Sequence, residues 1–525
     1  MSAAESRIVR GDAKIYKKIP SVHPLEDIRY YDTFPEFLGR IEAFGDAPAM
    51  AFGEDAPLSY ADLVSAVRGM CAYFAAQGLP REGNIGIYSP NSAFFAVCSF
   101  AVMAYGACAV HIPPSLPAAV LPALVQKYGL VTVLCPSVPE GADIPVLCPG
   151  DPLLYRERAA DGRFADNLRG TDPACIFFTG GTTGKSKGAI LSHTALLAGP
   201  VNAMYTLSTT EHVDAYHVLP LTHVFGYIRG FLVNLYLGNT VYFNAEKKNM
   251  FRDLRRVRPH EMVAVPRLCD MMLEFLEAGG AAALGGRMHT VISGAAPVPQ
   301  YLVRRFAEYG ITVYPGYGMT ETVNLTSGNP IPLEKPGSVG PVYPFTEAKI
   351  VDGELWLRGL NLFSGYYADE AETKAAFTDG WFRTGDLAHF DADNYLYITG
   401  RVKSLIVLPN GEKISPDVLE LAVLGVDEVQ DALLYLADRD GKKFLRLEVT
   451  LRKNAGAGQG ATAATPDTAQ AATAPSAEET AAQEAAILRK IAAAAATVPE
   501  ILRPQETVIR REDFARTPAM KIKRP

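Results

Sequence analysis

The chain has 525 residues and carries 50 Lys and Arg against 57 Asp and Glu, a formal net charge of −7. At roughly 150 residues per domain, this length predicts about three domains, or one large domain and one small one. Hydrophobic residues make up 48% of the chain and charged residues 20%, which excludes wholesale disorder. The acidic balance disfavours a nucleic-acid partner, because such proteins usually carry a basic surface, but it is compatible with a local phosphate site.

Cysteine usage and the N-terminus indicate a cytoplasmic protein. Seven cysteines are scattered along the chain and form no Cys-x-x-Cys pair, which excludes a zinc ribbon or a thioredoxin-like motif. Residues 1–20 lack the apolar core of a signal peptide. The most membrane-like stretch, 94–110, is near the lower length limit for a spanning helix. We expect a buried helix there rather than a transmembrane segment, with peripheral membrane contact left open.

Short apolar runs alternate with helix-like stretches through the first part of the chain. This order predicts an α/β domain whose parallel strands are covered on both faces. The runs lie at 84–88, 130–135, 174–179, 240–244, 262–265 and 289–293. At 353–358 and 395–399 the pattern changes to alternation, which indicates antiparallel strands.

The last part of the chain contains a long segment without core-forming residues. Residues 454–486 include no aromatic residue, Val, Ile, Leu or Met. Such a segment cannot bury enough apolar surface to offset its ordering entropy, so we predict a flexible insertion over most of it. Ser476 and Glu479 have the spacing of a capping box, which predicts that an Ala-rich helix begins there.

The strongest chemical motif is FFTGGTTGKSKG at 177–188, where an apolar strand runs directly into Gly, Thr and Lys. Glycine lets backbone N–H groups turn towards an anion, hydroxyls add donors and lysine adds charge, so this loop suits a polyphosphate. The motif is not a Walker A sequence, because Thr179 stands where that pattern requires Gly, five residues before Gly184. A P-loop NTPase fold is therefore disfavoured. An ordinary glycine-rich surface turn is the weaker alternative.

The second motif is YPGYGMTET at 314–322, which follows another strand-like run. It offers a Tyr ring, the hydroxyl of Thr320 and the carboxylate of Glu321. A carboxylate beside a phosphate loop suits Mg²⁺, which prefers oxygen ligands. Alone, the motif is equally consistent with an ordinary turn.

The third motif covers 379–401, DGWFRTGDLAHFDADNYLYITGR. We expect Asp386 to lie in a Gly-flanked turn, where its carboxylate can accept two ribose hydroxyls. Arg401 ends the next predicted strand and is expected to reach the same sugar or a phosphate. The alternative is a surface turn with a solvated arginine.

Together the three motifs resemble the adenylate-forming superfamily of acyl-CoA synthetases, peptide-synthetase adenylation domains and luciferases, from about residue 28 to Arg524. Further matching segments are LSYADL (58–63), LPLTHVFG (219–226), SGAAPV (293–298), GELWLRGLNLFSGYY (353–367) and RTPAMKIKR (516–524). The resemblance implies an α/β fold. A large N-terminal domain of layered α/β subdomains would cover 1–400, and a small α+β domain would cover 401–525 with the insertion at about 454–486. Lys403 matches the hinge about which the small domain rotates.

The resemblance also implies a reaction in two steps. A carboxylate attacks the α-phosphate of ATP, and a thiol, usually that of coenzyme A, then displaces AMP. Catalysis of this kind rests on positioning and charge neutralisation. The implied ligands are ATP, Mg²⁺ and coenzyme A.

The matching motifs imply a set of site residues. Lys521 is the implied adenylation lysine, and His223 is expected at the mouth of the carboxylate pocket. Thr320 is the implied phosphate contact, and Glu321 and Thr182 are the implied Mg²⁺ ligands. The remaining implied ATP and AMP contacts are Thr179, Gly180, Gly181, Thr182, Thr183, Gly184 and Lys187 at the phosphates, Gly294, Ala295, Pro315, Gly316, Tyr317 and Gly318 around the adenine, and Asp386 and Arg401 at the ribose.

The identity of the acid is less specified. Segments 219–243, 258–274 and 406–420 look most like long-chain fatty acyl-CoA synthetases, which favours a fatty acid. The apolar region 220–245 either lines an acyl tunnel or is ordinary core. The alternatives are a ligase for an aryl, dicarboxylic or other organic acid, and an acyl-AMP ligase that loads an acyl carrier protein. A non-catalytic binding protein is disfavoured, because Glu321, Asp386 and Lys521 are all present.

Overall fold

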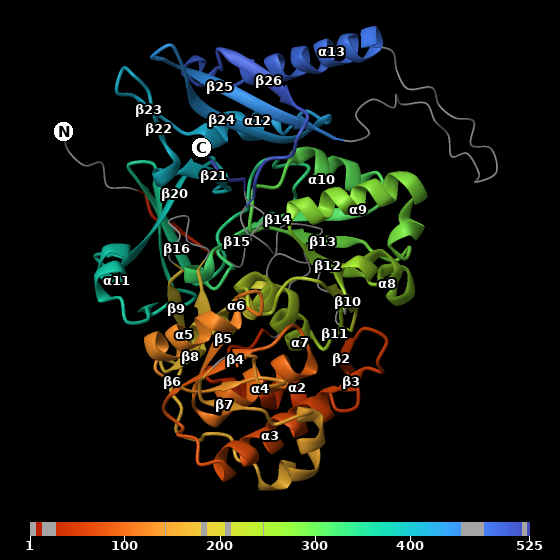
Figure 1. Ribbon diagram of the computed structural model, residues 1–525, viewed down its shortest axis with the longest axis vertical. Helices are drawn as coiled ribbons and strands as arrows, with labels where there is room; N and C mark the ends of the chain where they lie inside the picture. Colours follow the sequence, from red (N-terminus) through yellow and green to blue (C-terminus); the bar gives the residue numbers. More distant parts are fainter. Residues whose placement is uncertain are drawn as a thin grey trace.

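The computed structural model in Figure 1 has its C-terminal strands and α13 at one end of its longest axis, and α3 and β7 at the other. It describes residues 7–12, 28–141, 143–179, 186–204, 212–244, 246–452, 477–516 and 522–524.

The first sheet is mostly parallel and has the strand order β18-β9-β8-β5-β4-β6-β7. Its strands are β4 (Asn84–Tyr88), β5 (Cys108–Ile112), β6 (Leu130–Leu134), β7 (Val146–Leu147), β8 (Pro173–Phe178), β9 (Gly188–Ser192) and β18 (Gly365–Tyr366). Strands β9 and β18 pair antiparallel at one side. The associated helices are α2 (Phe34–Glu42), α3 (Tyr60–Ala76), α4 (Ala93–Tyr105), α5 (Leu121–Tyr128) and α6 (His193–Ala203).

The second sheet has the order β15-β14-β13-β12-β10-β11-β2-β3 and carries most of the site. Its strands are β2 (Pro48–Phe52), β3 (Leu58–Ser59), β10 (Asp214–His217), β11 (Thr240–Phe243), β12 (Glu261–Ala264), β13 (Thr290–Ser293), β14 (Thr312–Tyr317) and β15 (Ser327–Gly328). Its crossovers include the π-helix η3 (Phe225–Leu232), α7 (Val233–Leu237), α8 (Met250–Val257), α9 (Pro266–Gly279) and α10 (Gln300–Ala307).

The third sheet is antiparallel. It contains β1 (Val9–Arg10), β16 (Thr346–Val351), β17 (Glu354–Gly359), β19 (Phe377–Thr378), β20 (Trp381–Phe390) and β21 (Leu396–Arg401), and α11 (Glu370–Ala376) precedes β19. The short helical turn η7 (Val402–Ser404) follows it. The parallel strands predicted from apolar runs and the antiparallel strands predicted from alternation are all confirmed.

The C-terminal part has its own sheet and apolar core. Its elements are β22 (Ile406–Val407), β23 (Lys413–Ile414), α12 (Pro416–Val423), β24 (Val429–Arg439), β25 (Lys442–Leu451), α13 (Ala477–Ala496) and β26 (Glu506–Arg510). A cluster of buried side chains between Ile414 and Leu502 holds these elements together. The predicted Ala-rich helix is confirmed as α13, so the last ten residues of 454–486 are helical, and the rest of the expected insertion lies outside the described residues. Ser476 of the predicted capping box lies outside the described residues.

The expected single buried helix at 94–110 was wrong at its C-terminal end. Helix α4 begins after Ser92, whose hydroxyl accepts a hydrogen bond from the Phe95 N–H at 3.2 Å. It ends at Gly106, whose φ of 101° suits the left-handed residue that terminates a helix. The chain then continues as β5. The predicted burial is confirmed, and no helix in the described ranges is long and apolar enough to cross a membrane.

Six of the seven cysteines are buried, Cys148 is exposed, and all seven are free thiols. Burial raises the pKa of Cys71, Cys108 and Cys269 to about 12. The structure therefore agrees with the prediction of scattered reduced thiols.

The C-terminal sheet contacts α9 and α10 through a small polar cluster. The Arg452 guanidinium lies 3.3 Å from the ring centroid of Tyr301, and its Nη2 lies 3.6 Å from Asp270 Oδ1. Tyr301 donates a hydrogen bond to Asp270. Burial raises the pKa of Asp270 to about 6, although the charge of Arg452 opposes this rise.

Candidate active site

The three sequence motifs meet where several strands end. Strands β10, β12, β13 and β14 are parallel neighbours, and Ser293 at the end of β13 pairs with Pro315 of β14. The loop after β10 carries His223, and the loop after β13 carries Gly294 and Ala295. In open α/β sheets, ligands bind outside the carboxyl ends of the strands. This edge of the second sheet is therefore the candidate site.

The predicted phosphate loop connects the two strands of an antiparallel hairpin. The Thr179 N–H donates to the Lys187 carbonyl at 2.8 Å, and the Ser186 hydroxyl donates to the Thr179 carbonyl at 2.9 Å. A P-loop instead joins a strand to a helix, so the prediction that this chain is not a P-loop NTPase is confirmed. Gly180, Gly181, Thr182, Thr183 and Gly184 lie outside the described residues, as does Lys521. Their roles remain predictions.

Glu321 and Lys187 both contact Tyr366, one at its hydroxyl and the other over its ring. The Tyr366 hydroxyl donates to Glu321 Oε1 at 2.8 Å, and the Lys187 ammonium lies 4.5 Å from the centroid of the Tyr366 ring. Lys187 also pairs with Glu372 Oε2 at 2.5 Å. Burial raises the pKa of Tyr366, and the charge of Glu321 adds to the effect. Tyr366 thus stays a neutral donor that fixes the orientation of the Glu321 carboxylate.

Glu321 has the chemistry of a Mg²⁺ ligand in a nucleotide site. Mg²⁺ is commonly held by one or two carboxylates together with substrate phosphates, and it keeps several waters. No cluster of three or more metal-binding side chains occurs among the described residues. A metal held mainly by phosphate oxygens and Glu321 is consistent with that arrangement.

Asp386 is the centre of a buried polar network. Its Oδ2 accepts a hydrogen bond from the Tyr317 hydroxyl at 2.6 Å, and its Oδ1 pairs with Arg401 Nε at 2.7 Å. The Asp386 side chain is 3% exposed, whereas that of Arg401 is 42% exposed. Burial alone would lower the pKa of Arg401, but the Asp386 carboxylate outweighs it and raises the pKa. Burial also raises the pKa of Tyr317, with a further contribution from Asp386.

The expected Gly-flanked turn around Asp386 was wrong. Asp386 lies within strand β20, where Trp356 pairs with Arg383 and Glu354 pairs with Leu387, so β20 bulges between these pairs. Gly385 in the bulge has a φ of 71°, which is readily adopted only by glycine. The bulge places Asp386 opposite Arg401 on β21 and within reach of Tyr317.

The second motif folds back on itself under backbone strain. A Cβ at Gly318 would lie 2.3 Å from the Asn324 carbonyl, so only glycine fits there. Val323 and Asn324 have φ values of 54° and 62°, and Ala295 in the neighbouring loop has a φ of 65°. Positive φ is rare for a β-branched residue such as valine, and such strain clusters at functional sites. The motif is therefore not an ordinary turn.

A narrow cavity of about 20 Å³ opens among these loops, which is room for about one water molecule. Its lining residues are Phe225, Arg229, Ile292, Gly294, Ala295, Tyr314, Pro315, Gly316, Gly318, Asn324, Leu325, Ser327, Gly328, Asn329 and Tyr343. The cavity thus joins the predicted adenine loops to the π-helix. His223 lies exposed just before that helix, and its Nδ1 accepts a hydrogen bond from the Phe225 N–H at 3.2 Å.

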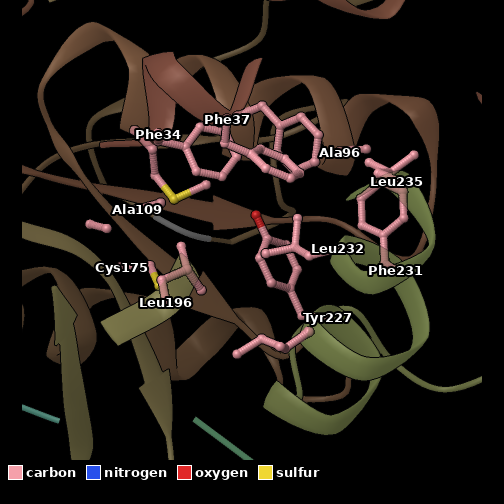
Figure 2. Close-up of a cluster of buried hydrophobic side chains, with 14 of the residues drawn as sticks. Phe34, Phe37, Ala96, Ala109, Cys175, Leu196, Tyr227, Phe231, Leu232 and Leu235 are labelled. Carbon is pink, nitrogen blue, oxygen red and sulfur yellow. The ribbon is translucent and has the colours of Figure 1, made fainter. Parts of the chain in front are cut away.

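Most of the apolar region 220–245 is core. Every residue from Phe225 to Leu237 is buried. Figure 2 shows Tyr227, Phe231, Leu232 and Leu235 packed in one cluster with aromatic side chains of α2. Of the two alternatives left open by the sequence, the ordinary core is correct for these side chains. Phe225 and Arg229 face the cavity instead.

Two further predicted site residues, Thr320 and Lys403, do not line the cavity. Thr320 is 8% exposed at the start of the turn η6 (Thr320–Thr322), next to Glu321. Lys403 is exposed on η7, directly after β21.

Sequence reasoning missed four residues at this site: Arg229, Ser327, Tyr366 and Glu372. Arg229 had a detectable signal, because it is the one charged residue in the apolar stretch 224–237. Tyr366 lies in the matching segment 353–367, but no local pattern marks the contacts of Tyr366 or Glu372, which join residues far apart in the chain. Ser327 had no signal.

A family model described as AMP-binding enzyme matches residues 37–367. The chain is 28% identical over 440 residues to a 4-coumarate–CoA ligase-like protein of Oryza sativa subsp. japonica, covering 75% of this chain and 79% of that protein. It is 27% identical over 491 residues to the long-chain-fatty-acid–CoA ligase FadD15 of Mycobacterium bovis, covering 78% and 81%.

Solved structures agree on the fold. ATP-bound MatB from Rhodopseudomonas palustris matches with a TM-score of 0.75 at 23% identity, over 92% of this chain and 97% of that one. The o-succinylbenzoate CoA synthetase of Bacillus subtilis, in complex with its acyl adenylate, gives a TM-score of 0.72 at 22% identity, over 93% and 96%. The predicted α/β fold with a large N-terminal and a small C-terminal domain is confirmed. The chain belongs to the AMP-binding enzyme family of adenylate-forming proteins.

Proposed function

We propose that the protein is an ATP-dependent acid–CoA ligase that forms AMP. The observation that carries the proposal is the meeting of three polar elements at one site. These are Lys187 at the described end of the Gly- and Thr-rich hairpin loop, the carboxylate of Glu321, and the buried Asp386 network. Relatives over most of the chain are named as CoA ligases, which supports the same reaction class.

The proposed reaction has two steps. A carboxylate oxygen of the acid attacks the α-phosphorus of ATP, the bond to the β-phosphate oxygen breaks, and pyrophosphate leaves. The sulfur of coenzyme A then attacks the carbonyl carbon, and AMP leaves with the electron pair of the C–O bond as the thiol proton is released. Both steps bring anions together, so positioned cations and donors supply most of the catalysis.

We assign the residues of this chain as follows. Asp386 accepts the ribose hydroxyls, with Tyr317 and Arg401 holding its carboxylate in place. Glu321 binds Mg²⁺, which would neutralise phosphate charge.

The loop from Thr179 to Lys187 binds the phosphates, Lys521 serves adenylation, and His223 stands at the entrance for the carboxylate. Lys403 is the proposed hinge between domains 1–400 and 401–525. Its exposed position on η7 directly after β21 is compatible with backbone rotation there.

The relatives specify the reaction more closely than the acid that is activated. Resemblance to FadD15 supports a fatty acid, while other relatives are named for 4-coumarate and oxalate. The cavity beside the π-helix has room for about one water molecule, which supports a short acid over a long alkyl chain. Transfer to an acyl carrier protein instead of coenzyme A is the second candidate. We place the protein in the cytoplasm on the strength of its free buried thiols.

The decisive experiment follows AMP release with ATP, Mg²⁺, coenzyme A and a panel of fatty, aryl and dicarboxylic acids. Turnover with at least one acid is expected. Lack of AMP with every acid would exclude the ligase, and AMP formed only with a carrier protein would favour the second candidate. Lys521→Ala should abolish formation of the acyl adenylate, while thioester formation from supplied acyl-AMP survives. Equal loss of both steps would remove the role assigned to Lys521.

A further inference from the structure

Arg229 is a buried cation without a protein counterion at bonding distance. The residue is 2% exposed, and neither its Nη1 nor its Nη2 has a hydrogen-bond partner among the described residues. Glu261 and Tyr343 favour its charge from a distance, but no ion pair with Arg229 forms within the described ranges. Burial lowers the pKa of Arg229. Arginine is strongly basic, so it still carries its charge in this environment.

The unpaired nitrogens belong to a side chain that lines the cavity of the candidate site. Arg229 and Phe225 are four residues apart on the π-helix, and both line that cavity. Gly230 lets this helix approach closely, because a Cβ there would lie 2.5 Å from the His217 ring. The helix begins at Phe225, two residues after His223, and His223 is exposed whereas Arg229 on the helix is buried.

A second unpaired donor lines the same cavity. Ser327 is fully buried in β15, and its hydroxyl has no partner in the part of the chain that the structure describes. Ser327 pairs with Tyr317 of β14 across the sheet. The Ser327 hydroxyl therefore belongs to the strand next to the second motif, 314–322. Two unpaired donors, one of them cationic, thus meet at a cavity whose other lining residues are aromatic or aliphatic, apart from glycines and the amides Asn324 and Asn329.

An unpaired buried charge is costly, and folded proteins rarely keep one without a ligand or partner. A carboxylate accepts two parallel hydrogen bonds from a guanidinium and further ones from a hydroxyl. A methyl group or an alkyl chain at the same place would leave every one of these donors unsatisfied. The lining therefore favours an anion in this cavity.

We propose that Arg229 and Ser327 bind a second carboxylate of the acid that is activated, so that the preferred substrates are short dicarboxylic acids. This inference rests on the proposed ligase function and specifies its substrate class. The first carboxylate reacts with ATP near His223, and the second one pairs with the guanidinium deeper in the cavity.

The test compares acids of equal length that differ in one carboxylate, namely butanoate with butanedioate and hexanoate with hexanedioate. With ATP, Mg²⁺ and coenzyme A, kcat/KM from AMP release should be about 100-fold higher for the better diacid than for its monoacid. Arg229→Met should lower kcat/KM for the diacid by about 100-fold, because the substrate carboxylate loses its charged partner. Activity with the monoacid should persist or rise. Ser327→Ala should show the same trend at about tenfold.

Arg255→Met is the matched control, since Arg255 is exposed on α8 and should leave both activities unchanged. If Arg229→Met fails to fold, the ratio of kcat/KM for the diacid and the monoacid is measured in Arg229→Lys and Ser327→Ala instead. A wild-type preference for monoacids that these variants leave unaltered would overturn the inference but retain the ligase. Absence of AMP with every acid would overturn the proposed function, and this inference with it.

Discussion

Asp386 and Arg229 are buried charges in the same candidate site, yet their surroundings are opposite. Both oxygens of Asp386 are bonded, one to Tyr317 and one to Arg401. Both terminal nitrogens of Arg229 lack a partner in the described ranges. The paired carboxylate is held in one orientation before any ligand arrives. The unpaired guanidinium is stabilised fully only when an anion enters. Asp386 is thus a group that other side chains hold in position, whereas Arg229 is a group that we propose binds the substrate.

The largest expected effect comes from removing the paired group. Asp386→Ala should lower kcat/KM for ATP by about 1000-fold, because two charge-assisted hydrogen bonds to the ribose are lost. Steady-state kinetics with varied ATP measures this loss. Asp393→Ala is the control, since that carboxylate is exposed in the turn after the same strand. A loss below about tenfold would show that the Asp386 network is structural rather than nucleotide-binding.

Asp270 is a buried acid, and the nearby charge of Arg452 only partly offsets the rise in its pKa that burial causes. Its pKa is raised from 3.8 to about 6, so the folded state binds a proton that the unfolded chain releases. This group therefore contributes stability below about pH 4 and loses it as the pH rises through about 6, by roughly 3 kcal/mol at most. Urea unfolding of Asp270→Asn should lack this part of the pH dependence.

Asp427→Asn provides the comparison for that experiment, because Asp427 pairs with Arg304 at the same face but is 57% exposed. It should keep the wild-type pH profile. Identical profiles for wild type and Asp270→Asn would mean that Arg452 compensates the Asp270 charge fully.

Tyr366 allows a test of the proposed metal ligand, Glu321. Tyr366→Phe removes the donor that orients Glu321, so the Mg²⁺ concentration for half-maximal activity should rise about tenfold. Activity titrated with Mg²⁺ at saturating ATP gives this value. Tyr367→Phe is a matched control from the adjacent position. An equal shift in both variants would point to disturbed packing around β18 instead of a lost hydrogen bond.

The smallest expected effect is a gain in stability rather than a loss of function. Without ligand, Arg229→Met should raise the free energy of unfolding by about 1 kcal/mol, because replacing a buried charge with an apolar side chain is often stabilising. Chemical denaturation of the free protein measures the change. Destabilisation by a similar amount would show that Arg229 has a favourable partner within the protein, and the contrast with Asp386 would fail.

Six strands of the first two sheets, namely β4, β6, β8, β11, β12 and β13, could be predicted because buried parallel strands appear as continuous apolar runs. The same property hid the end of α4, since helix and strand in 94–110 are both apolar and only Gly106 and Ala107 separate them. Motif residues such as Asp386 were found by resemblance, but the bulge that positions Asp386 was not. Tyr366 could not be found, because its hydrogen bond to Glu321 joins residues 45 positions apart. Long-range partners are determined by packing, which local patterns do not record.

The unequal exposure of the cysteines has a practical use. Cys148 is the exposed thiol, whereas the other six are buried. A maleimide dye should therefore label the large domain at this position without any engineering there. A second thiol introduced at the exposed Lys442 of β25 would place another dye on the C-terminal sheet. Energy transfer between the two fluorophores would then report in real time whether the C-terminal sheet rotates when ATP and coenzyme A are added in turn.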